Sequence, residues 1–307
     1  MQLGFIGTGT MGNPMARCLL EAGHQLTVYD TRREATTNLC EMGATWADHA
    51  RLVAEASEVV FTSLPGPPQM QETVLNPETG ILAGLKPGGG YIDMTTNSPT
   101  VFREVAEVCR THGIDVLDAP VSGRPPGMTI MVGGEAAAFE KYRPLLEAMG
   151  KNIFHLGGTG SGCITKLVTQ YLGYSNFVTA VEGLLIGAKA GVDIAALAQV
   201  VPVSAGASRV FDNIPRSVFS GDFGSNGSLD IVAKDLDLAC QLARDVEAPA
   251  RIGLIADDVF KRAQALGWGQ EGFPMAARIL EEMAGAKLRA PAGGDVTGYQ
   301  QEDPRRG

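Results

Sequence analysis

Three glycines near the N-terminus have the spacing that a dinucleotide-binding turn requires. They lie in the segment GFIGTGTMGNPMA, between an apolar strand-like run and a helical pattern. The first glycine permits a tight turn, the second lets the backbone approach a pyrophosphate, and the third lets helix and strand pack closely. Free N–H groups at the start of the helix would then bind the phosphates. The predicted cofactor-binding residues of this turn are Gly7, Thr8, Gly9, Thr10, Met11 and Gly12.

An acidic residue at the end of the next expected strand bears on which dinucleotide binds. Asp30, in LTVYDTRRE, is placed to accept hydrogen bonds from the hydroxyls of the adenosine ribose, and its charge would repel a 2′-phosphate. Arg32 follows closely, and a guanidinium group suits a 2′-phosphate. We therefore predict NAD as the cofactor, with NADP as the alternative.

Two later strand ends should reach the same ligand, because cofactors bind at the carboxyl ends of parallel strands. In FTSLPGPP, Leu64 and Pro65 offer an apolar wall. In YIDMTTNSP, Thr95 and Thr96 offer hydroxyl groups near the nicotinamide ribose. These four residues complete the predicted contacts of the N-terminal half with the cofactor.

A lysine further along the chain has the chemistry of a general acid and base. Lys166 lies in GTGSGCITKLVTQ, and Gln170 follows four residues later, so that on a helix the two side chains share a face. Oxidation of an alcohol requires that the hydroxyl proton be removed, and a partly desolvated lysine can take it. Gln170 would then hydrogen-bond the reacting oxygen or a carboxylate of the substrate.

Two more segments accompany this lysine, DAPVSG at residues 118–123 and VAKDLDLA, which contains Lys234. With the glycine turn and IDMTTNSP, and in this order, they resemble the β-hydroxyacid dehydrogenase family, whose best-known type is 3-hydroxyisobutyrate dehydrogenase. The resemblance covers about residues 1–285. It implies a Rossmann-type N-terminal domain, a helical C-terminal domain, a long helix that joins them and an active site in the cleft between them.

The resemblance also implies the reaction and the roles of single residues. Members of the family transfer hydride reversibly between a nicotinamide cofactor and a small 3-hydroxy acid. The family's acid/base lysine falls on Lys166, and its clamp for the substrate carboxylate falls on Ser122 and Gly123. Thr96 and Lys234 match positions near the nicotinamide end of the cofactor. Lys234 could equally form a surface ion pair with a neighbouring aspartate.

Three departures from the family pattern concern the substrate pocket. The family usually has Asn where this chain has Gln170, and its glycine-rich loop is shortened here to residues 124–128. Gly272 stands where an aspartate is common. We therefore expect a small carboxylate substrate other than 3-hydroxyisobutyrate. Reduction of a different polar group, such as an imine, and a non-catalytic dinucleotide-binding module are the alternative functions.

Composition narrows the class of protein. The formal net charge of −9 argues against nucleic acid as a partner, since a phosphate-backbone binder needs a basic surface. The five cysteines and four histidines are scattered and form no metal-ligand pattern, so we predict no metal and a reducing compartment. No leader or membrane-spanning run is evident. These features predict a cytoplasmic protein without a membrane partner.

The order of patterns predicts the fold class. Short strand-like runs alternate with helical stretches up to residue 162, as in a mostly parallel sheet with helices on both faces. Residues 163–289 form only helical patterns, the first of them a long helix at 163–190 that Gly191 ends and the next capped by Asp193. We expect a dinucleotide-binding domain at 1–162, a helical substrate and oligomerisation domain at 163–289, a flexible tail at 290–307, and a homodimer or homotetramer. The expected strands are residues 2–6, 25–29, 59–63, 91–94, 115–118, 129–132 and 153–155, and the expected helices are residues 11–22, 33–42, 99–112, 136–149, 163–190, 230–246, 249–266 and 274–288.

Overall fold

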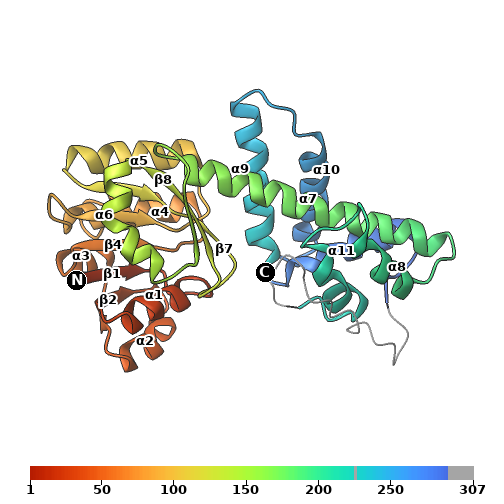
Figure 1. The fold of residues 1–307 in the computed structure, drawn as a ribbon, viewed down its shortest axis with the longest axis horizontal. Helices are drawn as coiled ribbons and strands as arrows, with labels where there is room; N and C mark the ends of the chain where they lie inside the picture. The colour runs from red at the N-terminus through yellow and green to blue at the C-terminus, as the bar shows by residue number, and fades with distance from the viewer. Residues whose placement is uncertain (225–226, 290–307) are drawn as a thin grey trace. The chain divides into compact units, whose positions relative to one another are not determined.

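The computed structural model describes residues 1–224 and 227–289, so the tail predicted at 290–307 lies outside the described residues. Contacts within the chain divide it into two units, one from Met1 to Leu167 and the other from Val168 onward (Figure 1). Helix α7 (Ser161–Lys189) begins in the first unit and continues into the second. The domain boundary predicted after residue 162 stays a prediction.

The first unit is built on one nine-stranded sheet in the order β3-β2-β1-β4-β5-β6-β8-β7, with β9 paired to β8. The pairs among β1 to β6 are parallel, whereas β8 runs antiparallel to β6 and to β7. The mostly parallel sheet of the prediction is therefore confirmed. The strands are β1 (Gln2–Ile6), β2 (Gln25–Tyr29), β3 (Thr45–Trp46), β4 (Val59–Thr62), β5 (Gly90–Asp93), β6 (Asp115–Asp118), β7 (Val121–Ser122), β8 (Thr129–Gly134) and β9 (Asn152–His155).

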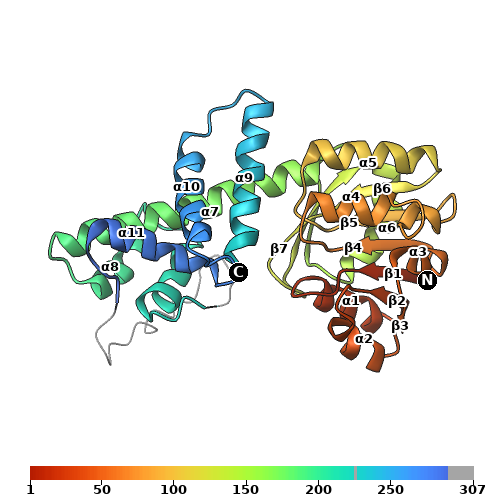
Figure 2. The same cartoon turned by 180° about the vertical axis from the view of Figure 1, so that it is seen from behind.

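Helices cover both faces of this sheet. The strands carry apolar side chains on both faces, and each face must be buried. Leu3 and Phe5 of β1 belong to one buried cluster, which contains residues of α1, α2 and α6, whereas Ile6 belongs to a second cluster with residues of α3, α4 and α5 (Figure 2). Burial on both faces is the condition under which parallel strands are stable. The helices are α1 (Gly12–Glu21), α2 (Thr37–Glu41), α3 (Ala50–Glu55), α4 (Pro67–Leu75), α5 (Pro99–Thr111) and α6 (Ala136–Glu147).

The prediction missed four of these elements. Strands β3 and β7 have two residues each, which is too short for an alternating pattern to appear. Helix α3 has six residues, and α4 begins with two prolines after a glycine, which favour a turn as much as a helix start. The expected helix at 33–42 is a 3-10 turn, Arg33–Thr36, followed by α2.

The second unit is helical, as predicted, around a core in which α7, α9 and α10 contribute most of the buried apolar side chains. Gly191, with φ of +91°, follows α7, and the Asp193 carboxylate accepts a hydrogen bond from the Ala195 N–H at the start of α8. Both predicted signals are thus confirmed. No helix within the described residues is long and apolar enough to cross a membrane. The helices after α7 are α8 (Ile194–Val200), α9 (Leu229–Asp245), α10 (Arg251–Ala265) and α11 (Ala277–Ala284), with short turns at Val201–Val203, Phe211–Asn213, Pro215–Phe219 and Phe273–Ala276.

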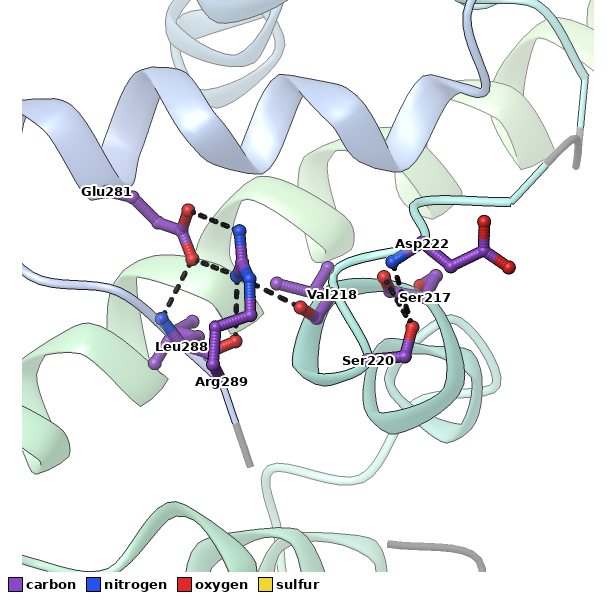
Figure 3. A network of polar contacts seen from close by, with 7 residues as sticks. All are labelled: Ser217, Val218, Ser220, Asp222, Glu281, Leu288 and Arg289. Carbon is purple, nitrogen blue, oxygen red and sulfur yellow. Dashed lines mark hydrogen bonds and ion pairs between the residues drawn. The ribbon is translucent and has the colours of Figure 1, made fainter. Parts of the chain in front are cut away.

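Arg289, the last described residue, forms an ion pair with the buried Glu281 of α11 and a hydrogen bond with the turn at Pro215–Phe219 (Figure 3). The carboxylate of Glu281, only 5% exposed, accepts two hydrogen bonds from the Arg289 guanidinium and one from the Leu288 N–H. Arg289 also donates to the Val218 carbonyl at 3.0 Å. The guanidinium therefore satisfies a buried charge and a turn carbonyl together.

We expect Arg289→Ala to lower the free energy of unfolding of the helical unit by about 2 kcal/mol, since Glu281 would remain buried without its cation. Urea unfolding followed by Trp268 fluorescence, in a Trp46→Phe background, measures this unit alone. Arg262→Ala removes an exposed pair with Asp258 and should leave the stability nearly unchanged. Equal losses in both variants would contradict the role of the buried pair.

Candidate functional site

The turn after β1 can be built only with glycine at the first and third glycine positions of its GxGxxG pattern. Gly7 has φ of +85°, and a Cβ atom there would lie 2.3 Å from the Ser63 carbonyl oxygen. A Cβ atom on Gly12 would lie 1.8 Å from the Gly7 carbonyl oxygen. The close packing of α1 against β1 that the sequence predicted therefore excludes any larger side chain at these two positions.

The middle glycine is different, because a Cβ atom on Gly9 would meet nothing closer than Arg32, at 4.0 Å. Gly9 borders an open pocket of about 420 Å³, which Thr8 and Thr10 also line. The Thr8 hydroxyl is buried and has no hydrogen-bond partner among the described residues, and no side chain caps α1. A helix start without a side-chain cap, an unsatisfied hydroxyl and free space above a glycine are what a bound pyrophosphate requires, so this turn fits a dinucleotide.

Asp30 holds this turn in place from the neighbouring strand end. One of its carboxylate oxygens accepts the Thr8 N–H at 2.8 Å, and the other accepts the Arg32 N–H at 2.9 Å. Each oxygen keeps a further lone pair with which it could bind a ribose hydroxyl. The position predicted for the ribose contact thus also orders the phosphate turn, which the sequence did not reveal.

The two arginines after Asp30 lie in different surroundings. Arg32 lines the open pocket together with Glu34, Asn13 and Asn38, so its guanidinium is available to a ligand in that pocket. Arg33 instead lies over the Trp46 ring, with its guanidinium carbon 4.2 Å from the ring centroid. Of the pair, only Arg32 lines the pocket beside the glycine turn, and its contact with the cofactor stays a prediction.

The ends of β4 and β5 are fastened to each other by a buried carboxylate. Asp93 accepts hydrogen bonds from the Thr62 hydroxyl at 2.7 Å, the Thr95 N–H at 3.1 Å and the Asn97 amide at 3.0 Å. Burial raises the pKa of Asp93 above its ordinary value, although these donors oppose the rise. The network fixes the loop that carries the two predicted threonines, and its only sequence signal is an acid at a strand end.

Two of the predicted wall and hydroxyl residues, Leu64 and Thr95, contact the glycine turn or the loop beside it. The Leu64 side chain approaches Gly7, since a Cβ atom there would be 3.0 Å from it. The Thr95 hydroxyl accepts the Leu64 N–H at 3.0 Å and is 2% exposed, so it braces the loop between β4 and α4. Thr96 is partly buried in the same loop, and Pro65 is exposed.

A second buried carboxylate, Asp118 at the end of β6, anchors the start of α7. It accepts the Gly160 N–H and the Cys163 N–H, each at 2.8 Å, and has no exposed surface. Gly162 makes this approach possible, because a Cβ atom there would lie 2.3 Å from the Met131 carbonyl oxygen. The motifs DAPVSG and GTGSGCITK, far apart in the sequence, are therefore joined by one side chain.

Lys166 follows three residues after Cys163 and is 7% exposed. A lysine this well buried is not a solvated surface charge, which is the ordinary state of the residue. Burial and the charges of Asp118 and Asp93 raise the pKa of the Cys163 thiol well above its usual range. A buried thiol with a raised pKa is rarely ionised, so Cys163 is a poor nucleophile, as the sequence suggested.

Ser122 and Gly123 lie on the other side of Asp118 along the chain, where β7 leads toward β8. Ser122 pairs in register with Thr129, and Gly123 has φ of +81°. Both are exposed, so the hydroxyl and the glycine N–H can be reached by a small anion. The role of Ser122 and Gly123 as a clamp for the substrate carboxylate stays a prediction.

In the helical unit, Gln170 and Lys234 both bind to one carboxylate. Asp235, 2% exposed, lies 2.8 Å from the Lys234 ammonium and accepts a hydrogen bond from the Gln170 amide at 2.6 Å. The Gln170 amide also donates to the Tyr174 hydroxyl at 2.7 Å. The sequence analysis offered a neighbouring aspartate only as a surface partner of Lys234. That aspartate is Asp235, which is buried on α9 and also binds Gln170.

No group of histidine, cysteine, aspartate or glutamate side chains within residues 1–224 and 227–289 is arranged to hold a metal ion. The candidate chemistry therefore rests on the glycine turn, Lys166 and the polar groups around them. Their hydrogen-bond donors suit an anionic cofactor and a carboxylate substrate.

Two family models match this chain. Residues 2–157 match the NAD binding domain of 6-phosphogluconate dehydrogenase, and residues 160–280 match the NAD-binding domain of NADP-dependent 3-hydroxyisobutyrate dehydrogenase. Among curated relatives, 2-(hydroxymethyl)glutarate dehydrogenase from Eubacterium barkeri is 34% identical over 94% of this chain and 97% of its own length.

Solved structures are similar over most of the chain. A 3-hydroxyisobutyrate dehydrogenase from Mycobacterium tuberculosis, determined with L-serine, has a TM-score of 0.82 and 27% identity, and the match covers 91% of this chain and 98% of that one. An imine reductase from Myxococcus stipitatus with NADP⁺ has a TM-score of 0.62 and 22% identity, covering 91% of this chain and all of that one. The second likeness concerns the fold alone.

The open space at Gly9 leads to a prediction about cofactor binding. Gly9→Ala should leave the folded structure intact but raise the Kd for NADH at least about tenfold, because its methyl group would occupy the space of the pyrophosphate. Fluorescence titration with NADH measures the effect. Gly158→Ala, at an exposed position with free space around it, is the matched control and should bind as the wild type does. Unchanged affinity in Gly9→Ala would mean that the phosphates bind elsewhere.

The buried Asp118 leads to a prediction about pH. Burial raises its pKa in the folded state, so the folded protein holds this proton more tightly than the unfolded chain does. The stability that Asp118 contributes should therefore be greatest at low pH and fall as pH rises from its ordinary pKa through the raised one.

Asp118→Asn, which cannot titrate, serves as the reference. Urea unfolding from pH 3.5 to 7, followed by Trp46 in a Trp268→Phe background, should show wild type losing stability relative to Asp118→Asn over that window. A relative gain for wild type with rising pH would show that the N–H groups lower the pKa more than burial raises it.

Proposed function

The chain belongs to the β-hydroxyacid dehydrogenase family, and we propose that it transfers hydride reversibly between a small 3-hydroxy acid and NAD(P), with Lys166 as the acid and base. One observation carries the assignment of the lysine. Its helix turn is fixed to the end of β6 through Asp118, so a buried lysine side chain lies in the unit that carries the dinucleotide turn. An accidental surface lysine would have neither the burial nor the anchor.

The N-terminal unit supplies the groups that would hold the cofactor. The N–H groups from Gly9 to Gly12 and the Thr8 hydroxyl suit the pyrophosphate, and Asp30 suits the adenosine ribose. Leu64, Pro65 and the Thr95–Thr96 loop belong to the adjoining strand ends, where the nicotinamide half would lie. NAD remains the proposed preference because of Asp30, with Arg32 leaving NADP open.

When bound, the nicotinamide ring supplies the acceptor of the hydride. The Lys166 amine takes the proton of the substrate hydroxyl as the carbon–oxygen double bond forms, and in reduction the Lys166 ammonium returns that proton to the oxygen. In each direction, one proton therefore moves between the lysine amine and the substrate oxygen, and none is gained or lost by the pair. The surrounding burial excludes water, which strengthens this proton transfer.

A carboxylate on the substrate would be held by Ser122 and Gly123. Both lie on a hairpin that begins at Asp118, the residue that also anchors Lys166. A single carboxylate thus connects the proposed clamp and the proposed acid/base group. A hydroxyl and an N–H group bind an anion without a buried cation, which suits a pocket where lysine must be able to lose its proton.

The shortened 124–128 loop and Gln170 support a substrate other than 3-hydroxyisobutyrate. One relative of this chain is named 2-(hydroxymethyl)glutarate dehydrogenase, and another was determined with L-serine, so the names of its relatives point to more than one hydroxy acid. Steady-state kinetics over a panel of 3-hydroxy acids would contradict this proposal if 3-hydroxyisobutyrate gave the highest kcat/KM.

Two other functions have less support. Imine reductases share the fold at 22% identity, but reduction of an imine needs no clamp for a carboxylate. A non-catalytic dinucleotide-binding module would not need a buried lysine. We further propose that the protein acts in the cytoplasm. We also propose that it forms a homodimer or homotetramer, and light scattering of the purified chain would measure this oligomeric state.

Lys166→Ala should lower kcat by about 10²–10⁴-fold, because the proton of the hydroxyl would have no acceptor. The Kd for NADH should change little, since the lysine lies outside the glycine turn. Lys151→Ala removes an exposed lysine and should keep full activity. If Lys166→Ala retained most of its turnover, another group would have to be the base.

A further inference from the structure

Gln170 is oriented by a carboxylate in a way that decides which atom it can offer to a ligand. Its amide group lies 2.6 Å from an oxygen of Asp235, which is paired with the Lys234 ammonium. A carboxylate in an ion pair accepts hydrogen bonds and donates none, so the atom that faces it must be the amide nitrogen.

The second hydrogen of the same nitrogen is used as well. It is donated to the Tyr174 hydroxyl at 2.7 Å, and Tyr174 stays a neutral phenol because burial and the charge of Asp235 raise its pKa. Both donors of the Gln170 amide are thus occupied by protein groups. The amide oxygen is then the part of the side chain that can bind a ligand, and it can only accept.

This side chain lies one helical turn from the acid/base group. Lys166 and Gln170 are four residues apart on α7, so they lie on one face of that helix about 6 Å apart along its axis. A substrate whose reacting hydroxyl is bound by Lys166 would extend its neighbouring atoms along this face. The carbon next to the reacting one, C2 of a 3-hydroxy acid, carries the group within reach of Gln170.

We propose that Gln170, held by Asp235, makes the enzyme select 3-hydroxy acids that carry a hydrogen-bond donor, a hydroxyl or an ammonium group, on C2. The inference rests on the proposed function, because it takes Lys166 as the acid/base group. A methyl group or hydrogen at C2 would leave the partly buried amide oxygen without a partner, and sites that lose such a bond discriminate strongly. Asp235 acts here as a positioning residue.

A pair of nearly isosteric substrates tests this selection. Glycerate has a hydroxyl on C2 where 3-hydroxyisobutyrate has a methyl group, and serine has an ammonium group. Both enantiomers of each are assayed by NADH absorbance. We expect glycerate or serine to exceed 3-hydroxyisobutyrate in kcat/KM by at least about tenfold, which corresponds to the loss of one hydrogen bond.

Three variants assign the preference to the oriented amide. Gln170→Met removes the acceptor, and Asp235→Asn lets the amide turn either way, so both should reduce the kcat/KM ratio to within about threefold of one. Tyr174→Phe keeps the bond to Asp235 and should retain the preference. A ratio that stays the same in Gln170→Met, or falls equally in Tyr174→Phe and Asp235→Asn, would overturn the inference.

The two proposals fail in different ways. If the wild type turns over 3-hydroxyisobutyrate as well as the C2 donors, the selection by Gln170 is wrong while the dehydrogenase remains. If the wild type turns over no hydroxy acid at all but binds NADH, the proposed function is wrong. The proposed selection by Gln170 is then wrong as well, because it depends on that function.

Discussion

The carboxylate of Asp118 is the interaction on which the arrangement of the site depends. It is buried at the end of a central strand and accepts N–H groups from the first residues of α7. Because a buried acceptor left without donors is costly, the helix cannot leave this strand end without a large loss of stability. The positions of Lys166 on one side and of Ser122 on the other both follow from this contact.

Asp93 and Asp235 act in the same way as Asp118, as buried carboxylates that hold two segments together. Each is almost fully buried, and each binds polar groups from a segment distant in the sequence. Asp93 fastens the β4 and β5 ends, and Asp235 fixes the amide of Gln170. Carboxylates suit this task because they accept several hydrogen bonds in fixed directions. Lys166 and Gln170 are the groups proposed to touch the ligands. The acids that hold Gln170 and the helix turn of Lys166 in place need not touch the ligands themselves.

Sequence patterns predicted the α/β class, the helical second half and the glycine turn well, because each has a local cause. Gly7, Gly12 and Gly191 are dictated by backbone geometry, and strands such as Gln2–Ile6 are buried on both faces. The roles of Asp118 and Asp235 depend on partners 42 and 65 residues away, and no local pattern records such pairings. Helix α3 and the two-residue strands β3 and β7 escaped prediction for a different reason, because they are too short for a periodic pattern to appear.

A crystal structure of the protein with NAD⁺ and a poorly reactive 3-hydroxy acid would show whether Lys166 is the acid/base group. We expect the Lys166 amine within hydrogen-bond distance, about 3 Å, of the substrate hydroxyl, with the dinucleotide lying over Gly9. A complex in which the amine points to bulk solvent, away from both ligands, would contradict that role.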